Sequence, residues 1–342
     1  MKTIDQIAQF FNDSEYFTGS VKLNENLAKH TTMHVGGNAK LFLEPENEES
    51  LIFAIKKLDA DVRRLTQIKS FFVLGGGSNV IISDSGLDAV VSTRKMNKIK
   101  FRTEGSEYTE SLIKREKLLN PEISLCSSKL CEEFKILCLE SGDSWGNVIS
   151  FCKKNNLGGF EAFTGLSGTV GGALFMNATC FGLSACDNLL SVRYFDLRDG
   201  KIHEYQKIDS DWGYKKSPFQ SFATTIILSA KFSVTTGFDS EKSEKCISDR
   251  KEKGHFRAPS AGSAFKNDAT HGIIAGKVID ECGLKGFSVG GAQIAPWHGN
   301  FIINPEQKAC ASDIKKLSDE VKKIVFEKKG VRLENEILFV ES

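Results

Sequence analysis

Hydrophobic and polar residues alternate along this chain with two periods, one typical of helices and one typical of strands. Apolar residues at intervals of three and four predict amphipathic helices, at residues 3–12, 47–58, 145–152, 274–282 and 314–325. Short apolar runs between turn residues predict strands, at residues 41–43, 71–74, 80–83, 87–92, 190–197, 201–205, 224–234, 301–303 and 336–340. This mixture predicts an α+β fold.

Capping and turn residues divide the pattern into segments. Asn47 is the predicted N-cap of its helix, and Gly283 and Gly330 are predicted to end the last two helices. Residues 100–132 are polar, charged and poorly periodic, which predicts a surface insertion near 102–132. Residues 235–243 lack a strong apolar period, so we interpret them as a domain junction followed by a compact α+β unit.

A glycine-rich loop lies between two of the predicted strands. Residues 75–79 read Gly-Gly-Gly-Ser-Asn, and successive glycine N–H groups can converge on an anion such as a phosphate. A dinucleotide-binding turn would open a helix, and a Walker loop would continue with Lys-Ser or Lys-Thr; neither follows here. Taken alone, the loop is equally compatible with a plain glycine hairpin.

Two further glycine-rich segments change this interpretation. Residues 165–173 read Gly-Leu-Ser-Gly-Thr-Val-Gly-Gly-Ala, residues 31–37 end in Gly-Gly, and both lie within strand-like sequence. Two anion-binding loops in one chain favour a ligand with two linked phosphates and a large apolar body. The economical hypothesis is a flavin dinucleotide held between two small α+β subdomains.

Composition and charge exclude several classes of partner. The 342 residues include 45 lysines and arginines against 44 aspartates and glutamates, which argues against nucleic acid or a membrane as the main partner. The chain has no secretory signal at its start and no apolar run of membrane-spanning length, so we expect a cytoplasmic protein. The nine cysteines form no Cys-x-x-Cys pair, which favours reduced thiols and no metal site.

Three segments could carry chemistry. They are residues 259–267 with Ser263, residues 212–218 with Lys215, and residues 333–337 with Glu336. Small residues around Ser263 would let a ligand come close, with donors on Lys266 and Asn267 nearby. Each segment also has a structural interpretation: a small-residue loop, a solvated pair of lysines, and a solvated strand end.

Seven motifs occur in a fixed order from about residue 30 to the C-terminus, at residues 31–37, 74–79, 165–177, 213–215, 259–267, 290–293 and 333–336. In this order they resemble the UDP-N-acetylenolpyruvoylglucosamine reductase (MurB) family. Each motif by itself is unspecific, whereas the ordered set is specific. The pattern is similar to the shorter subtype, which closes its site without an extra tyrosine-bearing loop.

The resemblance implies a fold and a reaction. The fold is two N-terminal subdomains of the vanillyl-alcohol-oxidase (PCMH) FAD-binding type, followed by a C-terminal α+β substrate domain. Residues 1–235 would bind FAD, with subdomains at about 1–95 and 96–235, and residues 236–342 would bind substrate. The reaction is the reduction, by NADPH through FAD, of the enolpyruvyl ether of UDP-N-acetylglucosamine to UDP-N-acetylmuramate for peptidoglycan synthesis.

The resemblance also implies roles for individual residues. Ser263 would donate a proton, while Glu336 and Lys215 would hold the substrate carboxylate and stabilise developing charge. The implied FAD-binding residues are Gly75, Gly76, Gly77, Ser78, Asn79, Gly165, Gly168, Thr169, Gly171, Gly172 and Asn177. The implied substrate-binding residues are Tyr214, Lys266, Asn267, Gln293 and His298, and no metal is implied.

The chain departs from the family pattern at several motif positions. Lys215 stands where the family usually has arginine, and a lysine lacks the planar fork that binds a carboxylate at two points. Further departures are Leu166-Ser167, Gly254-His255 and Trp297. Two alternatives therefore stay open: an FAD-dependent oxidoreductase of the same fold with another substrate, or an impaired homologue that only binds flavin or sugar nucleotide.

Overall fold

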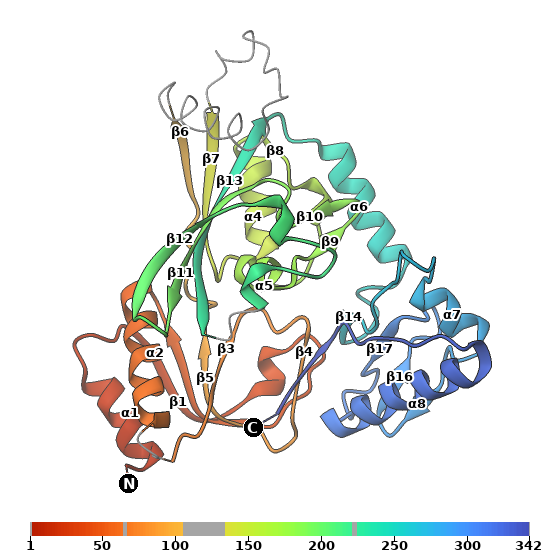
Figure 1. The fold of residues 1–342 in the computed structure, drawn as a ribbon, viewed down its shortest axis with the longest axis horizontal. Coiled ribbons are helices and arrows are strands. Elements are labelled where there is room, and N and C mark those ends of the chain that lie inside the picture. Colours follow the sequence, from red (N-terminus) through yellow and green to blue (C-terminus); the bar gives the residue numbers. More distant parts are fainter. Residues whose placement is uncertain (1, 64–66, 105–133, 221–223, 342) are drawn as a thin grey trace.

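The computed structural model describes residues 2–63, 67–104, 134–220 and 224–341. Figure 1 shows an N-terminal part in red and orange, a central part in yellow and green, and a C-terminal part in blue. Each part has its own sheet, and the polypeptide enters them in sequence order.

The N-terminal part is a mixed sheet covered by two helices. Its strands, in the order β1-β2-β5-β3, are β1 (Gly19–Asn26), β2 (Asn38–Pro45), β5 (Leu87–Ser92) and β3 (Phe71–Leu74). The helices are α1 (Ile4–Asp13) and α2 (Glu48–Arg63), and a short 3-10 turn, η1 (Leu27–His30), follows β1. The inner faces of the helices bury Phe11, Leu51, Ile55 and Leu58 completely or nearly so. Burying each such side chain contributes about 1.5–3 kcal/mol.

The central part is an antiparallel sheet packed against helices. Its strands, in the order β12-β11-β13-β7-β6, are β12 (Lys201–Gln206), β11 (Leu189–Asp196), β13 (Thr225–Thr236), β7 (Phe134–Glu140) and β6 (Lys100–Glu104). Shorter elements are α4 (Trp145–Lys154), β8 (Leu157–Gly158), η3 (Glu161–Phe163), α5 (Val170–Met176), β9 (Thr179–Cys180), β10 (Leu183–Ser184), η4 (Asp209–Asp211) and η5 (Pro218–Gln220). Trp145, Phe160, Phe163 and Phe232 meet in the core between the sheet and these helices.

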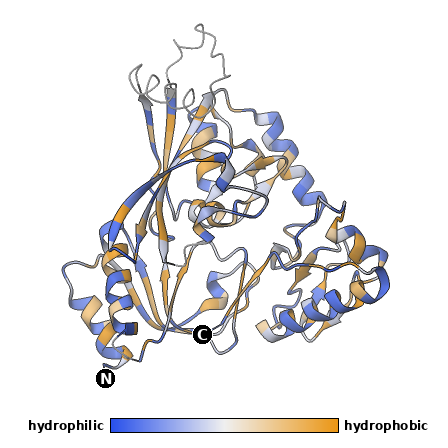
Figure 2. Ribbon diagram, in the orientation of Figure 1, coloured by the Kyte–Doolittle hydropathy of each residue, from blue (hydrophilic) through white to orange (hydrophobic). Residues whose placement is uncertain are grey.

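The C-terminal part is a small antiparallel sheet with one long helix. Its strands, in the order β14-β17-β16-β15, are β14 (Ser260–Ser263), β17 (Phe301–Ile303), β16 (Ala292–Ile294) and β15 (Ser288–Val289). The helices are α6 (Ser240–Glu252), α7 (Ala275–Glu281) and α8 (Ala311–Lys329). Figure 2 shows hydrophilic and hydrophobic residues along α8, whose Ile314, Leu317, Val321 and Val325 are fully buried.

The C-terminus returns to the N-terminal part. Strand β18 (Leu338–Val340) pairs in parallel with β4 (Val80–Ile82), which directly follows the first glycine-rich loop. The turn after β4 also contacts the C-terminal part, because Asp84 accepts hydrogen bonds from the backbone N–H groups of Ala311 and Ser312 at the start of α8. Residues near the C-terminus are thereby held beside the glycine-rich loop.

Several predictions from the sequence are confirmed. The fold is α+β, and a helix occupies each of the five predicted ranges, with ends that differ by a few residues. Asn47 caps its helix as predicted, because its Oδ1 accepts the Ser50 N–H at 2.8 Å. Gly330 ends α8 in the left-handed conformation at φ 67°. The described residues contain free cysteines, of which Cys152, Cys186, Cys246 and Cys282 are buried.

Other predictions are wrong. The stretch 100–104 is not insertion but strand β6, paired with β7; the rest of the predicted insertion, residues 105–132, lies outside the described residues. The second glycine-rich segment runs into helix α5 rather than strand, and strand β18 begins at Leu338, two residues after Glu336. The polar sequences of β1 and α6 gave no apolar period, and both elements were missed because tertiary packing stabilises them.

Among the helices of the described residues, none is both long enough and apolar enough to cross a bilayer.

Replacing Asp84 with alanine should weaken the junction between β4 and α8. We expect Asp84→Ala to lower the free energy of unfolding by about 1 kcal/mol at pH 7, because two helix-terminal N–H groups lose their acceptor. Burial opposes ionisation of Asp84, but these hydrogen bonds outweigh it and keep its pKa below the usual value. Its contribution should therefore be present above about pH 4 and disappear as the pH falls through the folded-state pKa.

Urea unfolding of the two proteins at pH 7 and at pH 3 measures this difference. Asp209→Ala is the control, because Asp209 is an exposed residue whose carboxylate pairs with Lys207, and removing an exposed ion pair costs little. Equal losses for both variants would contradict the proposed capping role.

Candidate functional site

The two glycine-rich loops meet at backbone distance. A Cβ on Gly76 would lie 2.4 Å from Cα of Gly168, and a Cβ on Gly168 would lie 2.6 Å from Oγ of Ser78. A Cβ on Gly75 would lie 2.6 Å from Oγ1 of Thr169. A Cβ on Gly76 would overlap backbone and force the loops apart, whereas those on Gly75 and Gly168 would displace side-chain hydroxyl groups.

The loops form one end of a cavity of about 640 Å³. Eight of the residues that the sequence assigned to a cofactor line it: Gly75, Gly76, Gly77, Ser78, Asn79, Thr169, Gly171 and Gly172. Apolar side chains from several elements make other walls, among them Phe175, Phe219 and Ile226. A polar backbone end joined to an apolar body is a typical composition of a cofactor pocket.

Three residues assigned to the cofactor do not line this cavity. Gly168 contacts Ser78 at the approach of the loops, and a Cβ on Gly165 would point toward Ile247. Asn177 is buried at the C-terminal end of α5, in the left-handed conformation at φ 42°. The sequence could not distinguish residues that face the cavity from residues that hold the loops together.

Lys215 and Glu336 form an ion pair although 121 positions separate them in the chain. Nζ of Lys215 lies 2.6 Å from Oε1 of Glu336, and each side chain is only 12% exposed. The sequence also allowed both side chains to be solvated at the surface; that interpretation is wrong for Lys215 and Glu336. A shielded pair of this kind is less screened by water and salt than a surface pair.

Ser263 lies next in the chain to a residue that holds Glu336. It ends strand β14 opposite Phe301, and the carbonyl of the adjacent Ala264 accepts the Glu336 N–H at 2.8 Å. Two of the three residues that the sequence assigned to catalysis, Lys215 and Glu336, thus meet, and Ser263 is linked to Glu336 through the backbone of its neighbour Ala264. Only the tertiary fold makes this possible, since the three segments lie far apart in the chain.

The predicted substrate-binding residues have varied surroundings. Tyr214 is 52% exposed, and its hydroxyl accepts the Asn267 N–H at 3.4 Å. The turn that carries Tyr214 and Lys215, called the lysine turn below, therefore contacts the C-terminal part. Asn267 also accepts the Ala275 N–H at the start of α7, and Lys266 pairs with the exposed Glu334.

Gln293 and His298 lie in the small C-terminal sheet and its adjoining turn. Gln293 donates to the Gly286 carbonyl at 3.2 Å, which occupies one of its amide hydrogens. His298 stacks on Phe301 at 3.8 Å between ring centres, and burial lowers the pKa of its imidazole. A neutral His298 at pH 7 could accept or donate a hydrogen bond but would not supply a charge.

Two residues that support the loops gave no signal in the sequence. Arg94 donates from Nη2 to the carbonyl of Gly76 at 2.7 Å and so fixes the first loop. Asp143 lies behind the second loop, where its carbonyl accepts the Val170 N–H and its Oδ2 accepts the Glu140 N–H. Burial raises the pKa of Asp143 to about 7, and the described residues offer no hydrogen-bond partner to its Oδ1.

The described residues contain no group of three histidine, cysteine or acidic side chains arranged to hold a metal ion.

Comparison with known proteins identifies the family. Residues 254–340 match the family model described as the C-terminal domain of UDP-N-acetylenolpyruvoylglucosamine reductase. The reductase of Treponema denticola is 38% identical over 341 residues, covering 94% of both chains. The chain belongs to the UDP-N-acetylenolpyruvoylglucosamine reductase family.

Other members of this reductase family are also similar to the chain along most of its length. The Borreliella burgdorferi reductase is 35% identical, covering 92% of this chain and 93% of its own length. The crystal structure of the reductase from Thermus caldophilus matches with a TM-score of 0.66 at 28% identity, covering 95% of this chain and 99% of that one. The resemblance found in the ordered motifs, and the fold class that it implied, are thus confirmed for the chain as a whole.

Adding a methyl group at the contact between the loops should damage the reductase fold. We expect Gly76→Ala to lower the free energy of unfolding by about 1–3 kcal/mol, because the new Cβ overlaps backbone rather than a movable side chain. Gly146→Ala in helix α4 is the matched control: its Cβ would have no neighbour nearer than 3.9 Å. That change should be neutral or stabilising by up to about 1 kcal/mol. Urea unfolding at pH 7 measures both, and a neutral Gly76→Ala would contradict the close approach.

Replacing Asp143 with asparagine should change how stability depends on pH. Between about pH 4 and pH 7 the folded wild type holds a proton that the unfolded chain has released, so its stability falls as the pH rises. The fall is at most about 1.4 kcal/mol per pH unit, and it should level off above pH 7. Asp143→Asn should lose this slope, which urea unfolding at pH 5, 6, 7 and 8 would reveal. Parallel profiles for the two proteins would show that Asp143 ionises normally.

Proposed function

We propose that this protein reduces the enolpyruvyl ether of UDP-N-acetylglucosamine to UDP-N-acetylmuramate, with electrons from NADPH that pass through FAD. Membership of the reductase family supports the reaction. The observation that carries it to this chain's own residues is the shielded Lys215–Glu336 ion pair, whose Glu336 is hydrogen-bonded to the backbone of Ala264, the neighbour of Ser263. A cytoplasmic location and a role in peptidoglycan synthesis follow from the proposed substrate.

The cavity between the two loops fits FAD. Glycines at 75–77 leave backbone N–H groups uncovered by side chains, which suits a diphosphate. Phe175, Phe219 and Ile226 provide apolar walls for a flat ring system. Gly75, Gly76, Gly77, Ser78, Asn79, Thr169, Gly171 and Gly172 would contact the cofactor, with Gly165, Gly168 and Asn177 as the remaining predicted members of this set. Bound FAD supplies hydride transfer, and the protein supplies placement and electrostatics.

Ser263 is the proposed proton donor. Hydride addition to the terminal carbon of the enolpyruvyl group leaves excess electron density on the carbon that bears the carboxylate. Oγ of Ser263 would protonate that carbon, a transfer that becomes feasible when the hydroxyl is positioned against a strong base. Lys215, held in place by its ion pair with Glu336, would orient the substrate carboxylate and stabilise the charge that develops there.

The remaining predicted residues would bind the rest of the substrate. Tyr214 and Asn267 already contact each other, so they can form one wall between the lysine turn and the C-terminal part. Lys266, Gln293 and His298 would contact the sugar nucleotide from the C-terminal part. On this proposal residues 1–235 hold the cofactor, in subdomains of about 1–95 and 96–235, and residues 236–342 hold the substrate.

An anaerobic two-step experiment tests the function. The protein is loaded with FAD, reduced with NADPH until the flavin absorbance bleaches, and then mixed with the enolpyruvyl sugar nucleotide. We expect the oxidised flavin spectrum to return and UDP-N-acetylmuramate to form. Recovery with another acceptor, but not with this substrate, would favour a different oxidoreductase. A protein that stays colourless with added FAD would reject the proposal altogether.

Ser263→Ala separates the two half-reactions. We expect reduction by NADPH to keep its wild-type rate, whereas reoxidation by substrate slows by about 100-fold or more, the scale of a lost general acid. Ser260→Ala is the control, because Ser260 lies in the same strand and its hydroxyl accepts the Gly262 N–H. Equal slowing of both half-reactions would remove Ser263 from the role of proton donor.

A further inference from the structure

Two asparagines, one in the first glycine-rich loop and one at the end of the helix that follows the second, hold the backbone around the Lys215–Glu336 ion pair. Asn79 is the last residue before β4, and Asn177 is the residue that ends α5. The sequence assigned both to the cofactor. Their side-chain hydrogen bonds instead lead to Glu336 and to the turn that carries Lys215.

Asn79 holds the backbone of Glu336. Its Nδ2 donates to the Glu336 carbonyl at 3.0 Å, and its own carbonyl accepts the Leu338 N–H at 2.9 Å. The N–H of Glu336 is taken by Ala264. Residue 336 is therefore fixed on both sides just before β18, and one of those contacts comes directly from the first glycine-rich loop.

Asn177 holds the turn that carries Lys215. Its Nδ2 donates to the Gly213 carbonyl at 2.8 Å. Gly213 and Lys216 exchange two backbone hydrogen bonds, which closes a tight turn with Lys215 at φ 54°. A non-glycine residue in this conformation is strained and persists when its surroundings hold it.

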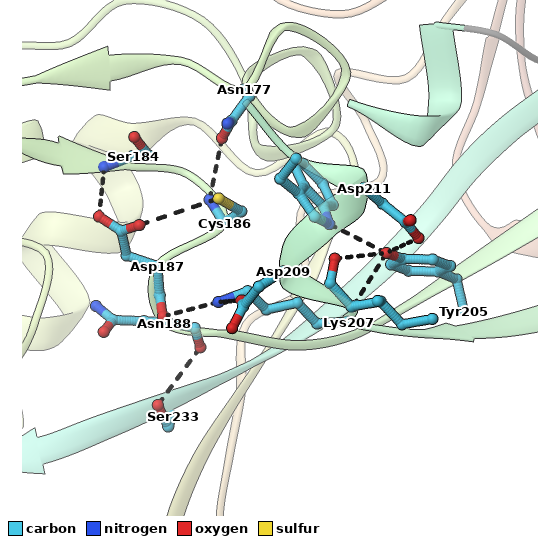
Figure 3. A network of polar contacts seen from close by, with 12 residues as sticks. Asn177, Ser184, Cys186, Asp187, Asn188, Tyr205, Lys207, Asp209, Asp211 and Ser233 are labelled. Carbon is cyan, nitrogen blue, oxygen red and sulfur yellow. Dashed lines mark hydrogen bonds and ion pairs between the residues drawn. The ribbon is translucent and has the colours of Figure 1, made fainter. Parts of the chain in front are cut away.

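Neighbouring contacts lock Asn177 itself. Its Oδ1 accepts the Cys186 N–H at 3.3 Å, and Figure 3 shows this bond at the edge of a polar network that continues through Asp187 and Ser184. Gln220 adds a hydrogen bond to the carbonyl of Lys215 at 3.1 Å. Helix α5 therefore carries the cofactor loop at its first residue and the lysine turn at its last.

We propose that Asn79 and Asn177 are positioning residues, which set the distance and direction of the Lys215–Glu336 pair relative to the two glycine-rich loops. The reason is geometric: the pair acts on substrate only if it is held at a fixed place relative to the bound flavin, and displacements near 1 Å are costly in such sites. Asn79 holds Glu336 directly from the first loop, and Asn177 holds the lysine turn from the far end of the helix that begins at the second loop. The kinetic part of this inference rests on the proposed function.

Chemical labelling tests the positioning role without any turnover. The purified full-length protein is treated with an acetylating reagent, and mass spectrometry follows the modification rate of Lys215. Asn79→Ala and Asn177→Gly each remove one amide, and glycine keeps the left-handed conformation at position 177. We expect Lys215 to react about two- to tenfold faster in both variants, the range that one lost hydrogen bond implies.

Two matched variants control for general loosening. Asn188→Ala removes an amide that donates to the Gly159 carbonyl at 2.8 Å, a contact outside the turn that carries Lys215. Asn156→Gly replaces another left-handed asparagine, at φ 52°, whose Oδ1 accepts the Phe238 N–H. Neither should change the labelling of Lys215, while Glu336→Gln should raise it by removing the partner.

A double-mutant cycle adds the kinetic test. If Asn177 acts through Lys215, then Asn177→Gly as a single substitution should slow flavin reoxidation by substrate. The same substitution should cause no further slowing in a protein that already carries Lys215→Met. The FAD dissociation constant is measured for every variant. Unchanged Lys215 labelling would overturn the proposal, and weakened FAD binding in the same variants would leave both asparagines with the cofactor role alone. Failure of the wild type to reoxidise would reject the proposed reaction but leave the labelling result valid.

Discussion

The close approach of two glycine-rich loops is the constraint on which the rest of the site depends. Gly76 and Gly168 pass each other with no room for a Cβ atom. The backbones of two segments that lie some ninety positions apart in the chain are therefore in direct contact. The cavity opens from this contact, and Arg94 and Asp143 hold the loops from behind. Because backbone cannot yield as a flexible side chain can, the contact fixes how the N-terminal and central parts meet.

The second requirement is the return of the chain's last strand. Pairing of β18 with β4 carries Glu336 back to the first loop, and Asp84 fastens the start of α8 to the same turn. Glu336 thereby comes within 2.6 Å of Lys215 from the central part. Lys215 comes from the central part, and Glu336 comes from the C-terminal segment that pairs with the N-terminal part, so the ion pair forms only when these parts are assembled.

Lysine at position 215 changes how this region can hold a carboxylate. A lysine offers a compact charge on a flexible stem rather than a rigid fork, so its direction must be set by its surroundings. Here those surroundings are a strained turn, the ion pair with Glu336, and the amides of Asn177 and Gln220. These contacts fix the backbone of the turn and so restrict the positions that the lysine side chain can reach.

The sequence by itself determined most of the elements and the family. Apolar periods located α1, α2, α4, α7 and α8, since burying one face is what stabilises such helices. The ordered motifs gave the reductase resemblance, because the glycines and reactive side chains of such a site can be recognised directly in the sequence. The polar elements β1, β6 and α6 left no such record and depend on neighbours that are distant in sequence.

The tertiary structure alone decided how the residues of the site are paired. Nothing local to Lys215 or Glu336 indicates that each is the other's partner, and both segments were compatible with solvated surface. The same holds for Asn79 and Asn177, whose amides could have faced a cofactor but donate to the backbone around that pair. A sequence records which groups are available, whereas hydrogen-bond partners depend on distances across the fold that no local pattern encodes.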